Sequence, residues 1–274
     1  MRAPLLLLLS LALAACHGPP EPPPRVDPTP PPVAAKPAPP PSEPPAPPPP
    51  ATVERVRVPG DRAASVVRAA DGSAPRTVFL PGVCSNANAY LQGFREAARR
   101  QGGVVAIEGD QPCGNLQGFH TFSWDAAKIH ARIEAALVAA GTTEIPAGGI
   151  VLVGYSQGAA LGEQLAQRWP ERYTELVLIG APTDPVPAHF ARARGVVTMA
   201  CSRDVTARMK EAAAGVARSG VPSTYVEMPG CTHGNLADGD ARFDAVFDFL
   251  RERARPPRTE AASIPLVGQI VDDG

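Results

Sequence analysis

The stretch that decides the fold is IVLVGYSQGAA, residues 150–160. An apolar, β-branched run stops at Gly154-Tyr155-Ser156-Gln157-Gly158, and an alanine-rich, helix-forming run follows. This pattern predicts a buried strand, a sharp turn with Ser156 at its tip, and a helix. Glycines at both ends of this serine turn (residues 154–158) allow close backbone approach and let the serine hydroxyl project outward. We predict that Ser156 is a nucleophile; the alternative is an ordinary Gly- and Ser-rich loop between a strand and a helix.

The N-terminus has the pattern of an export signal, predicted over residues 1–15. Arg2 supplies a positive start, and the apolar run 5–13 is too short to span a bilayer as a helix. The tetrapeptide 13–16, Leu-Ala-Ala-Cys, resembles the lipobox of bacterial lipoproteins. That resemblance implies cleavage before Cys16 and acylation of its sulfur and its new amino group. The alternative is an ordinary secretory signal in which Cys16 is incidental.

Two expectations follow from this start of the chain. Lipidation of Cys16 would place the protein in a bacterial cell envelope, anchored to a lipid bilayer by acyl chains. His17 after the cysteine is compatible, by analogy, with sorting to the outer membrane. Residues 16–50 are dominated by proline, which donates no backbone hydrogen bond, so we predict a disordered, extended spacer. A PxxP ligand for a partner domain is the alternative.

Strands alternate with helices over residues 51–255, which predicts one α/β domain followed by a tail, 256–274. The fold class is a mostly parallel, doubly wound sheet of about eight strands. We predict strands at 52–58, 64–69, 77–80, 104–107, 150–153, 176–179, 196–199 and 223–228. We predict helices at 86–100, 124–140, 157–168, 204–218 and 240–253, and a long Gly-rich loop at 109–123.

A serine hydroxyl needs a positioned base, usually a histidine oriented by a carboxylate. In a sheet of this kind such residues lie on loops that follow the carboxyl ends of strands. Asp204 follows the strand at 196–199, and His233 lies on a Gly-flanked loop after the strand at 223–228. Asp184, after the preceding strand, is the rival acid. Asp204 has the alternative role of capping its helix.

The core, about 53–253, resembles the α/β-hydrolase superfamily, in its compact esterase or dienelactone-hydrolase-like branch. The serine turn, the Asp204 turn and the Gly230-x-x-His233-Gly234 loop carry this resemblance. It implies Ser156 as nucleophile, Asp204 as acid and His233 as base.

The resemblance also locates an oxyanion hole. One donor is the backbone N–H of Gln157, the residue after the nucleophile. The second comes from the loop after the strand at 77–80, where the family has a His-Gly-x turn and this chain has Pro81-Gly82-Val83. The match assigns it to the Val83 N–H, with Cys84 as the second choice.

Four cysteines remain besides Cys16, and in an exported protein they predict two disulfides, with three possible pairings. All four follow strands, at the edge where the site is expected. Because neighbouring loops carry each pair, we predict Cys84–Cys113 and Cys201–Cys231. Free buried cysteines are the alternative.

About fifteen residues separate the strands at 176–179 and 196–199, which leaves no room for a large lid. The open site favours accessible acyl esters of modest size. We expect substrate contacts from Tyr155, His120 and Phe119.

The predicted function is a lipid-anchored serine hydrolase that cleaves small-molecule carboxylic esters through an acyl-enzyme. It needs no metal or cofactor and no obligate protein partner. The net charge of −1 gives no electrostatic case for nucleic-acid binding. A thioesterase or peptidase on the same residues, or a non-catalytic envelope-anchored binding module, is the alternative.

Overall fold

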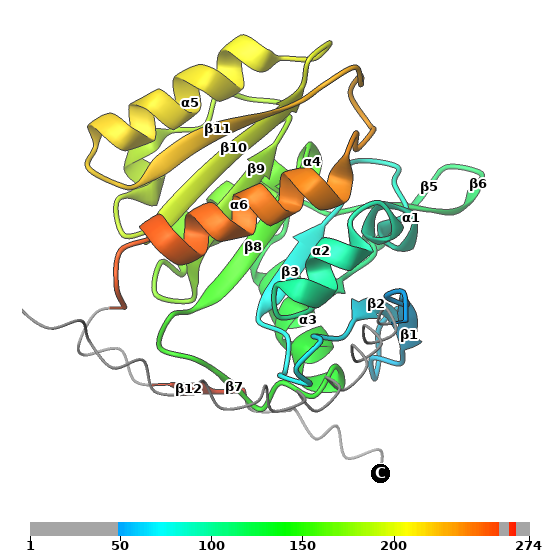
Figure 1. Ribbon diagram of the computed structural model, residues 1–274. Helices are drawn as coiled ribbons and strands as arrows, with labels where there is room; N and C mark the ends of the chain where they lie inside the picture. The colour runs from blue at the N-terminus through cyan, green and yellow to red at the C-terminus, as the bar shows by residue number, and fades with distance from the viewer. Residues whose placement is uncertain (1–48, 258–262, 267–274) are drawn as a thin grey trace, which may run out of the picture. The chain divides into compact units, whose positions relative to one another are not determined.

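The structure, a computed structural model, describes residues 49–257 and 263–266. Its centre is an eight-stranded sheet with strand order β1-β2-β4-β3-β8-β9-β10-β11 (Figure 1). The strands are β1 (Glu54–Val56), β2 (Ala64–Val67), β3 (Thr77–Leu80), β4 (Val104–Ala106), β8 (Ile150–Tyr155), β9 (Tyr173–Ile179), β10 (Gly195–Cys201) and β11 (Ser223–Met228).

The sheet is parallel except at one strand. β2 runs antiparallel to both β1 and β4, and the other strand pairs are parallel. β3, β8, β9 and β10 are buried along their whole length, because helices cover both faces of a parallel sheet. The predicted fold class, a mostly parallel and doubly wound sheet of about eight strands, is confirmed.

The helices form a layer on each face of the sheet. They are α1 (Ala87–Gln92), α2 (Arg95–Arg100), α3 (Ala126–Ala139), α4 (Gln157–Arg168), α5 (Thr206–Arg218) and α6 (Gly239–Arg253). α1, α2 and α6 pack into the apolar cluster on one face, and α3, α4 and α5 into the cluster on the other. Figure 1 shows α2 and α6 in front of the sheet. In α3 the apolar stripe is Ile129, Ile133 and Leu137, one residue per helical turn.

The single helix predicted at 86–100 is wrong. Two short helices replace it, and the chain breaks between them at Gly93 and Phe94. α6 packs into this break, since an added Cβ on Gly239 would lie 2.0 Å from the Gly93 carbonyl oxygen. Asp240 then accepts a hydrogen bond from the Ala97 N–H at 2.8 Å, within the first turn of α2. A contact across 143 residues therefore holds α2 against α6 at the break.

The prediction of a long loop at 109–123 is also wrong. It contains a hairpin of β5 (Gln111–Cys113) and β6 (Leu116–Thr121), which Figure 1 shows projecting beside α1. Gly114 turns the chain with φ +52°, and the pairing shifts register between Pro112 and Cys113. Alternation of apolar and polar residues is the usual signal of a strand in a sequence, and the irregularly paired β5 and β6 do not have it.

The segment between β9 and β10 contains one short 3-10 helix, η1 (Pro187–Phe190), so the prediction that no large lid lies there is confirmed. Part of the predicted tail also pairs: β12 (Ile264–Pro265) runs antiparallel to β7 (Glu144–Ile145). The predicted export signal, Cys16 and nearly all of the proline-rich spacer lie outside the described residues. In the part of the chain that is described, no helix has the length and apolar character needed to cross a membrane.

Candidate active site

The serine turn joins β8 to α4 in a strained conformation. Ser156 has φ 52° and ψ −113°, which costs about 1–3 kcal/mol for a residue other than glycine. Its N–H donates to the Ile179 carbonyl at 2.8 Å, which fixes the turn against β9. An added Cβ at Gly154 would lie 2.2 Å from the Gly158 carbonyl oxygen, and one at Gly158 would lie 2.1 Å from that of Leu80. Only glycine therefore fits at either end of the serine turn.

Three predicted residues form a hydrogen-bonded row. His233 Nε2 lies 3.0 Å from Ser156 Oγ, and His233 Nδ1 lies 2.7 Å from Asp204 Oδ2. Asp204 is enclosed, with 9% of its side chain exposed, whereas 46% of the His233 side chain is exposed. A base whose one nitrogen faces a carboxylate and whose other faces a hydroxyl has the geometry needed to activate a serine.

Asp184, the rival acid, lies apart from this row. Its side chain is 88% exposed and pairs with Arg208 Nε at 2.7 Å. The structure thus brings Asp204, rather than Asp184, to His233.

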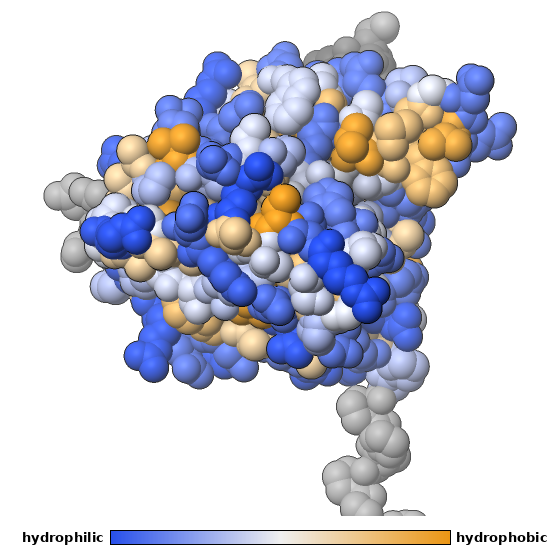
Figure 2. Space-filling view, turned by 90° about the horizontal axis from the view of Figure 1, so that it is seen from above, coloured by the Kyte–Doolittle hydropathy of each residue, from blue (hydrophilic) through white to orange (hydrophobic). Residues whose placement is uncertain are grey.

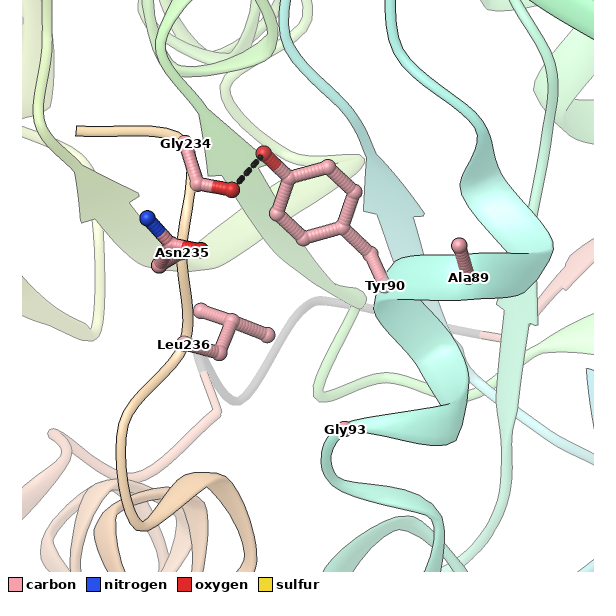
Figure 3. A pocket seen from close by; sticks show the side chains of 6 residues that line it. All are labelled: Ala89, Tyr90, Gly93, Gly234, Asn235 and Leu236. Atoms are coloured by element: carbon pink, nitrogen blue, oxygen red, sulfur yellow. Dashed lines mark hydrogen bonds between the residues drawn. The ribbon is translucent and has the colours of Figure 1, made fainter. Parts of the chain in front are cut away.

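Two tyrosine hydroxyls hold the loop that carries His233. Tyr155 Oη accepts the Gly234 N–H at 2.7 Å and donates to the Asn235 carbonyl at 3.4 Å. Tyr90 Oη donates to the Gly234 carbonyl at 2.8 Å, the bond drawn dashed in Figure 3. The Tyr155 ring also meets the His233 ring edge to face, with centroids 5.4 Å apart. The loop is therefore fastened by two side chains next to the imidazole.

The position of Tyr155 corrects the expectation that it contacts substrate. The residue is 1% exposed and lies beneath the His233 loop. Its hydroxyl accepts a hydrogen bond from the loop backbone. Burial raises the pKa of the Tyr155 phenol to about 12. The group therefore keeps the proton with which it bonds to the loop up to a higher pH than an exposed tyrosine does.

A hollow of about 220 Å³ adjoins the same loop (Figure 3). Its lining carries no charged side chain and comes from α1 with its C-cap and from the residues after His233: Ala89, Tyr90, Gly93, Gly234, Asn235 and Leu236. Figure 3 shows the two groups of residues facing each other across it.

Both predicted disulfides are present. Cys201–Cys231 joins the acid loop to the base loop, with Cα atoms 5.0 Å apart. Backbone contacts reinforce this link: the Arg203 N–H donates to the Cys231 carbonyl at 3.2 Å, and the Gly230 N–H donates to Ser202 Oγ at 2.9 Å. The Asp204 and His233 loops are thus held together next to the residues they present.

Gly180 is a residue of the site that the sequence analysis missed. It follows β9 with φ +54°, and an added Cβ would lie 2.9 Å from Asp204 Oδ2 and 3.1 Å from His233 Cε1. Any side chain there would displace the carboxylate or the imidazole. The available signal was its place directly after a buried strand, at the carboxyl edge of the sheet.

The two predicted oxyanion donors border Ser156. Gln157 is the next residue, and the turn after β3 packs against the serine, since an added Cβ on Gly82 would lie 3.2 Å from Ser156 Cβ. Among the described residues, neither the Val83 N–H nor the Gln157 N–H donates a hydrogen bond. Gln157 is the first residue of α4, where a backbone N–H has no partner within the helix.

The β5–β6 hairpin is fixed to both of these donor segments. Gln157 Oε1 accepts from Thr121 Oγ1 at 2.9 Å and from the Phe122 N–H at 3.0 Å, and its Nε2 donates to the Phe122 carbonyl at 2.8 Å. At the other end Cys84, next to Val83, is bonded to Cys113. The sequence does not reveal this role of the Gln157 side chain, because its partners lie 35 and 36 residues away.

The two other predicted substrate contacts lie on β6. His120 Nδ1 faces buried Glu108, 3.6 Å from Oε2, and Glu108 also accepts the Ala87 N–H at 3.0 Å. Phe119 is 44% exposed on the hairpin. Throughout residues 49–257 and 263–266, no three His, Cys, Asp or Glu side chains are grouped so that they could hold a metal ion.

No protein-family model and no curated protein sequence matches the chain. Among solved structures, the esterase PE8 is similar with a TM-score of 0.51 and 19% identity, covering 69% of this chain and 97% of that one. A CIB-like hydrolase from Thermoplasma acidophilum has a TM-score of 0.54 and 17% identity, covering 73% of this chain and 98% of that one. The chain has an α/β-hydrolase fold. The likeness shows the fold alone, because one fold hosts many activities.

Proposed function

We propose that the chain is a serine hydrolase that cleaves carboxylic esters through an acyl-enzyme intermediate. The observation that carries the proposal is the row Asp204–His233–Ser156, with 2.7 Å and 3.0 Å between its atoms, on a strained turn between strand and helix. Structural proteins have no need of a serine at positive φ next to a histidine that a carboxylate orients.

In the proposed reaction, Ser156 Oγ attacks the ester carbonyl carbon while its proton passes to His233 Nε2. Asp204 holds Nδ1–H and stabilises the imidazolium that forms. The C–O bond to the alcohol then breaks, and the alcohol leaves with the proton from Nε2. A water molecule, deprotonated by the same nitrogen, attacks the acyl-enzyme. The bond between the acyl carbon and Ser156 Oγ then breaks, Oγ takes the proton from Nε2, and the acid is released.

The negative charge of each tetrahedral intermediate is assigned to the Val83 and Gln157 N–H groups. Two free donors on a rigid backbone support this assignment. Donors fixed in advance need no reorganisation when the charge develops, and one such donor contributes about 10²–10³-fold to kcat.

We also propose that the protein is exported and anchored to a bilayer in a bacterial cell envelope. Support comes from the sequence, in which Leu13-Ala14-Ala15-Cys16 follows a short apolar run. The proline-rich spacer would hold the hydrolase away from the lipid surface. Radioactive palmitate incorporated into the expressed chain, and absent from Cys16→Ser, tests the anchor; labelling of Cys16→Ser would contradict it.

Ester hydrolysis tests the catalytic proposal. Ser156→Ala should lower kcat for p-nitrophenyl acetate about 10⁴-fold or more, and Asp204→Asn about 10⁴-fold. Asp184→Asn is the matched control, since that carboxylate pairs with Arg208 away from His233, and it should stay within about twofold. Wild-type protein that folds without hydrolysing esters would favour the non-catalytic binding module, and greater loss in Asp184→Asn than in Asp204→Asn would refute the assigned acid.

A further inference from the structure

Two segments beside Ser156 carry no Asp, Glu, Lys or Arg. They are residues 77–94, which contain β3 and α1, and residues 111–124, which contain the hairpin. Charged residues make up 19% of the whole chain, so their absence from both segments sets this side of the site apart. The adjoining carboxylates of Glu108 and Asp110 are buried and face His120 and Lys128, so a charged ligand would find no counter-charge within the two segments themselves.

The same two segments expose large apolar side chains. Val83 is 57% exposed, Leu116 59%, Phe119 44% and Trp124 57%. Over the described part of the chain, the other exposed large hydrophobics are scattered one to an element or segment: Val138, Val186 and Ile264. Figure 2 shows apolar side chains gathered over the hairpin side of the molecule, at the upper right. Apolar side chains that gather on a surface indicate a binding site more strongly than single ones do.

Covalent and hydrogen bonds tie the hairpin to the turn that follows β3 and carries the predicted donor Val83. Cys84, next to Val83, is bonded to Cys113, which pairs with Leu116 across the hairpin. The backbones of Ser85 and His120 exchange two hydrogen bonds of 2.9 Å, which places Phe119 beside the same turn. Asn86 Nδ2 adds a bond of 2.9 Å to the carbonyl of Gly118. Val83, Leu116 and Phe119, here named the apolar shelf, therefore lie on segments that a disulfide and hydrogen bonds join to one another.

The strand order places the segments that carry the shelf and the segment that carries His233 on different sides of β8. β3 and β4, which carry the shelf, lie on one side of β8, and β11, which carries the His233 loop, lies at the opposite edge of the sheet. His233 delivers the proton to the departing alcohol, so the alcohol half belongs near His233. The acyl half stays bonded to Ser156 until the second step and is free to extend away from His233, toward the segments that carry the shelf.

We propose that the apolar shelf binds the hydrocarbon acyl group of an uncharged ester, so that medium-chain acyl esters are the substrates. The proposal rests on the serine-hydrolase function proposed above and names its substrate class. An octanoyl chain laid on Val83, Leu116 and Phe119 removes apolar surface from water on both partners, which favours it over an acetyl group.

The test compares kcat/KM of the full chain for p-nitrophenyl octanoate and p-nitrophenyl acetate. In the double variant Leu116→Ser/Phe119→Ser, the ratio of octanoate to acetate should fall about tenfold or more from its wild-type value. Both residues are exposed, so the fold should tolerate the change. Val138→Ser, on α3 and 37% exposed, is the matched control and should keep the wild-type ratio.

Other outcomes separate the shelf from the catalytic proposal. Normal acetate hydrolysis with an unchanged ratio in the double variant would overturn the shelf alone. If the double variant keeps the ratio and loses binding to phosphatidylcholine vesicles, the surface contacts a membrane and the proposal is likewise overturned. Failure of the wild-type chain to hydrolyse either ester would overturn the serine-hydrolase function, and the shelf proposal with it.

Discussion

Ser156 and His233 lie 3.0 Å apart, yet different kinds of structure hold them. The serine turn is enclosed between β8 and α4, with Ser156 8% exposed and backbone atoms filling the space beside both of its glycines. The His233 loop is exposed and has no regular structure of its own. A disulfide and two tyrosine hydroxyls fasten it to the rest of the domain.

This contrast separates local from distant determinants of the site. The nucleophile is positioned by a strand, a turn and a helix that are continuous in sequence, and main-chain packing leaves it no freedom. The base is positioned by side chains that come from distant segments, since the Tyr90 bond to Gly234 spans 144 residues. Changes at the serine turn should therefore affect folding, whereas changes at the anchors of the His233 loop should affect catalysis more than folding.

The largest expected effect is at the serine turn. Gly158→Ala would bring a Cβ within 2.1 Å of the Leu80 carbonyl oxygen, which is a backbone atom and cannot move aside easily. We therefore expect the variant either not to fold or to lose more than about 4 kcal/mol of unfolding free energy. Gly60→Ala is the matched control, because its φ is +69° and no atom lies within 4 Å; it should lose about 1–2 kcal/mol. Urea unfolding followed by circular dichroism measures both, and equal losses would refute the packing argument.

The next effect concerns the covalent anchor of the His233 loop. Cys201→Ala/Cys231→Ala opens a link between residues 30 apart in sequence, and the unfolding free energy should fall by about 3–4 kcal/mol. Cys84→Ala/Cys113→Ala, with a separation of 29, should lose nearly the same amount.

Activity then distinguishes the two disulfides. Loss of Cys201–Cys231 loosens Asp204 against His233, so kcat for p-nitrophenyl acetate should fall, whereas loss of Cys84–Cys113 should reduce the preference for octanoate over acetate. Reversal of these two signatures would show that the anchors are assigned to the wrong loops.

A smaller effect is expected at the tyrosine anchor. Tyr155→Phe removes the hydrogen bonds to Gly234 and Asn235, and we expect kcat to fall about tenfold, which corresponds to the net worth of about one hydrogen bond. KM should hardly change, because Tyr155 is buried, with 1% of its surface exposed. Tyr225→Phe, whose hydroxyl meets Glu227 at the surface, is the control. A change in KM at constant kcat would contradict a positioning role.

The smallest expected effect is on the unfolding free energy above about pH 10, where tyrosines titrate. Burial raises the pKa of all four tyrosines, Tyr90, Tyr155, Tyr173 and Tyr225. Above pH 10 the unfolded chain therefore releases protons that the native chain retains, and the unfolding free energy falls as the pH rises toward 12, the pKa of Tyr155. Absorbance at about 295 nm should show little phenolate in native protein near pH 10.5 and its abrupt appearance on unfolding. Full ionisation of the native protein at that pH would contradict the raised pKa of these phenols.

The contrast between local and distant determinants also explains which features the sequence predicts. α4 and β3 begin and end at the predicted residues, because each is a continuous apolar or helix-forming run. The order of Ser156, Asp204 and His233 along strand ends is visible for the same reason. The break at Gly93 and the irregular β5–β6 hairpin are not visible, since both depend on contacts with segments far along the chain. Tyr155 shows the limit most directly: its place in the motif indicates nearness to Ser156, and only packing shows that its hydroxyl turns toward the His233 loop.

The most direct test of the central claim is covalent labelling of Ser156. A fluorophosphonate should add one adduct to the folded wild-type chain, peptide mass spectrometry should place it on Ser156, and Ser156→Ala should take no label. Labelling of Tyr155→Phe should be slower than that of wild type, because the imidazole is less firmly placed. A folded wild-type protein that takes no label, or an adduct on a residue other than Ser156, would contradict the account.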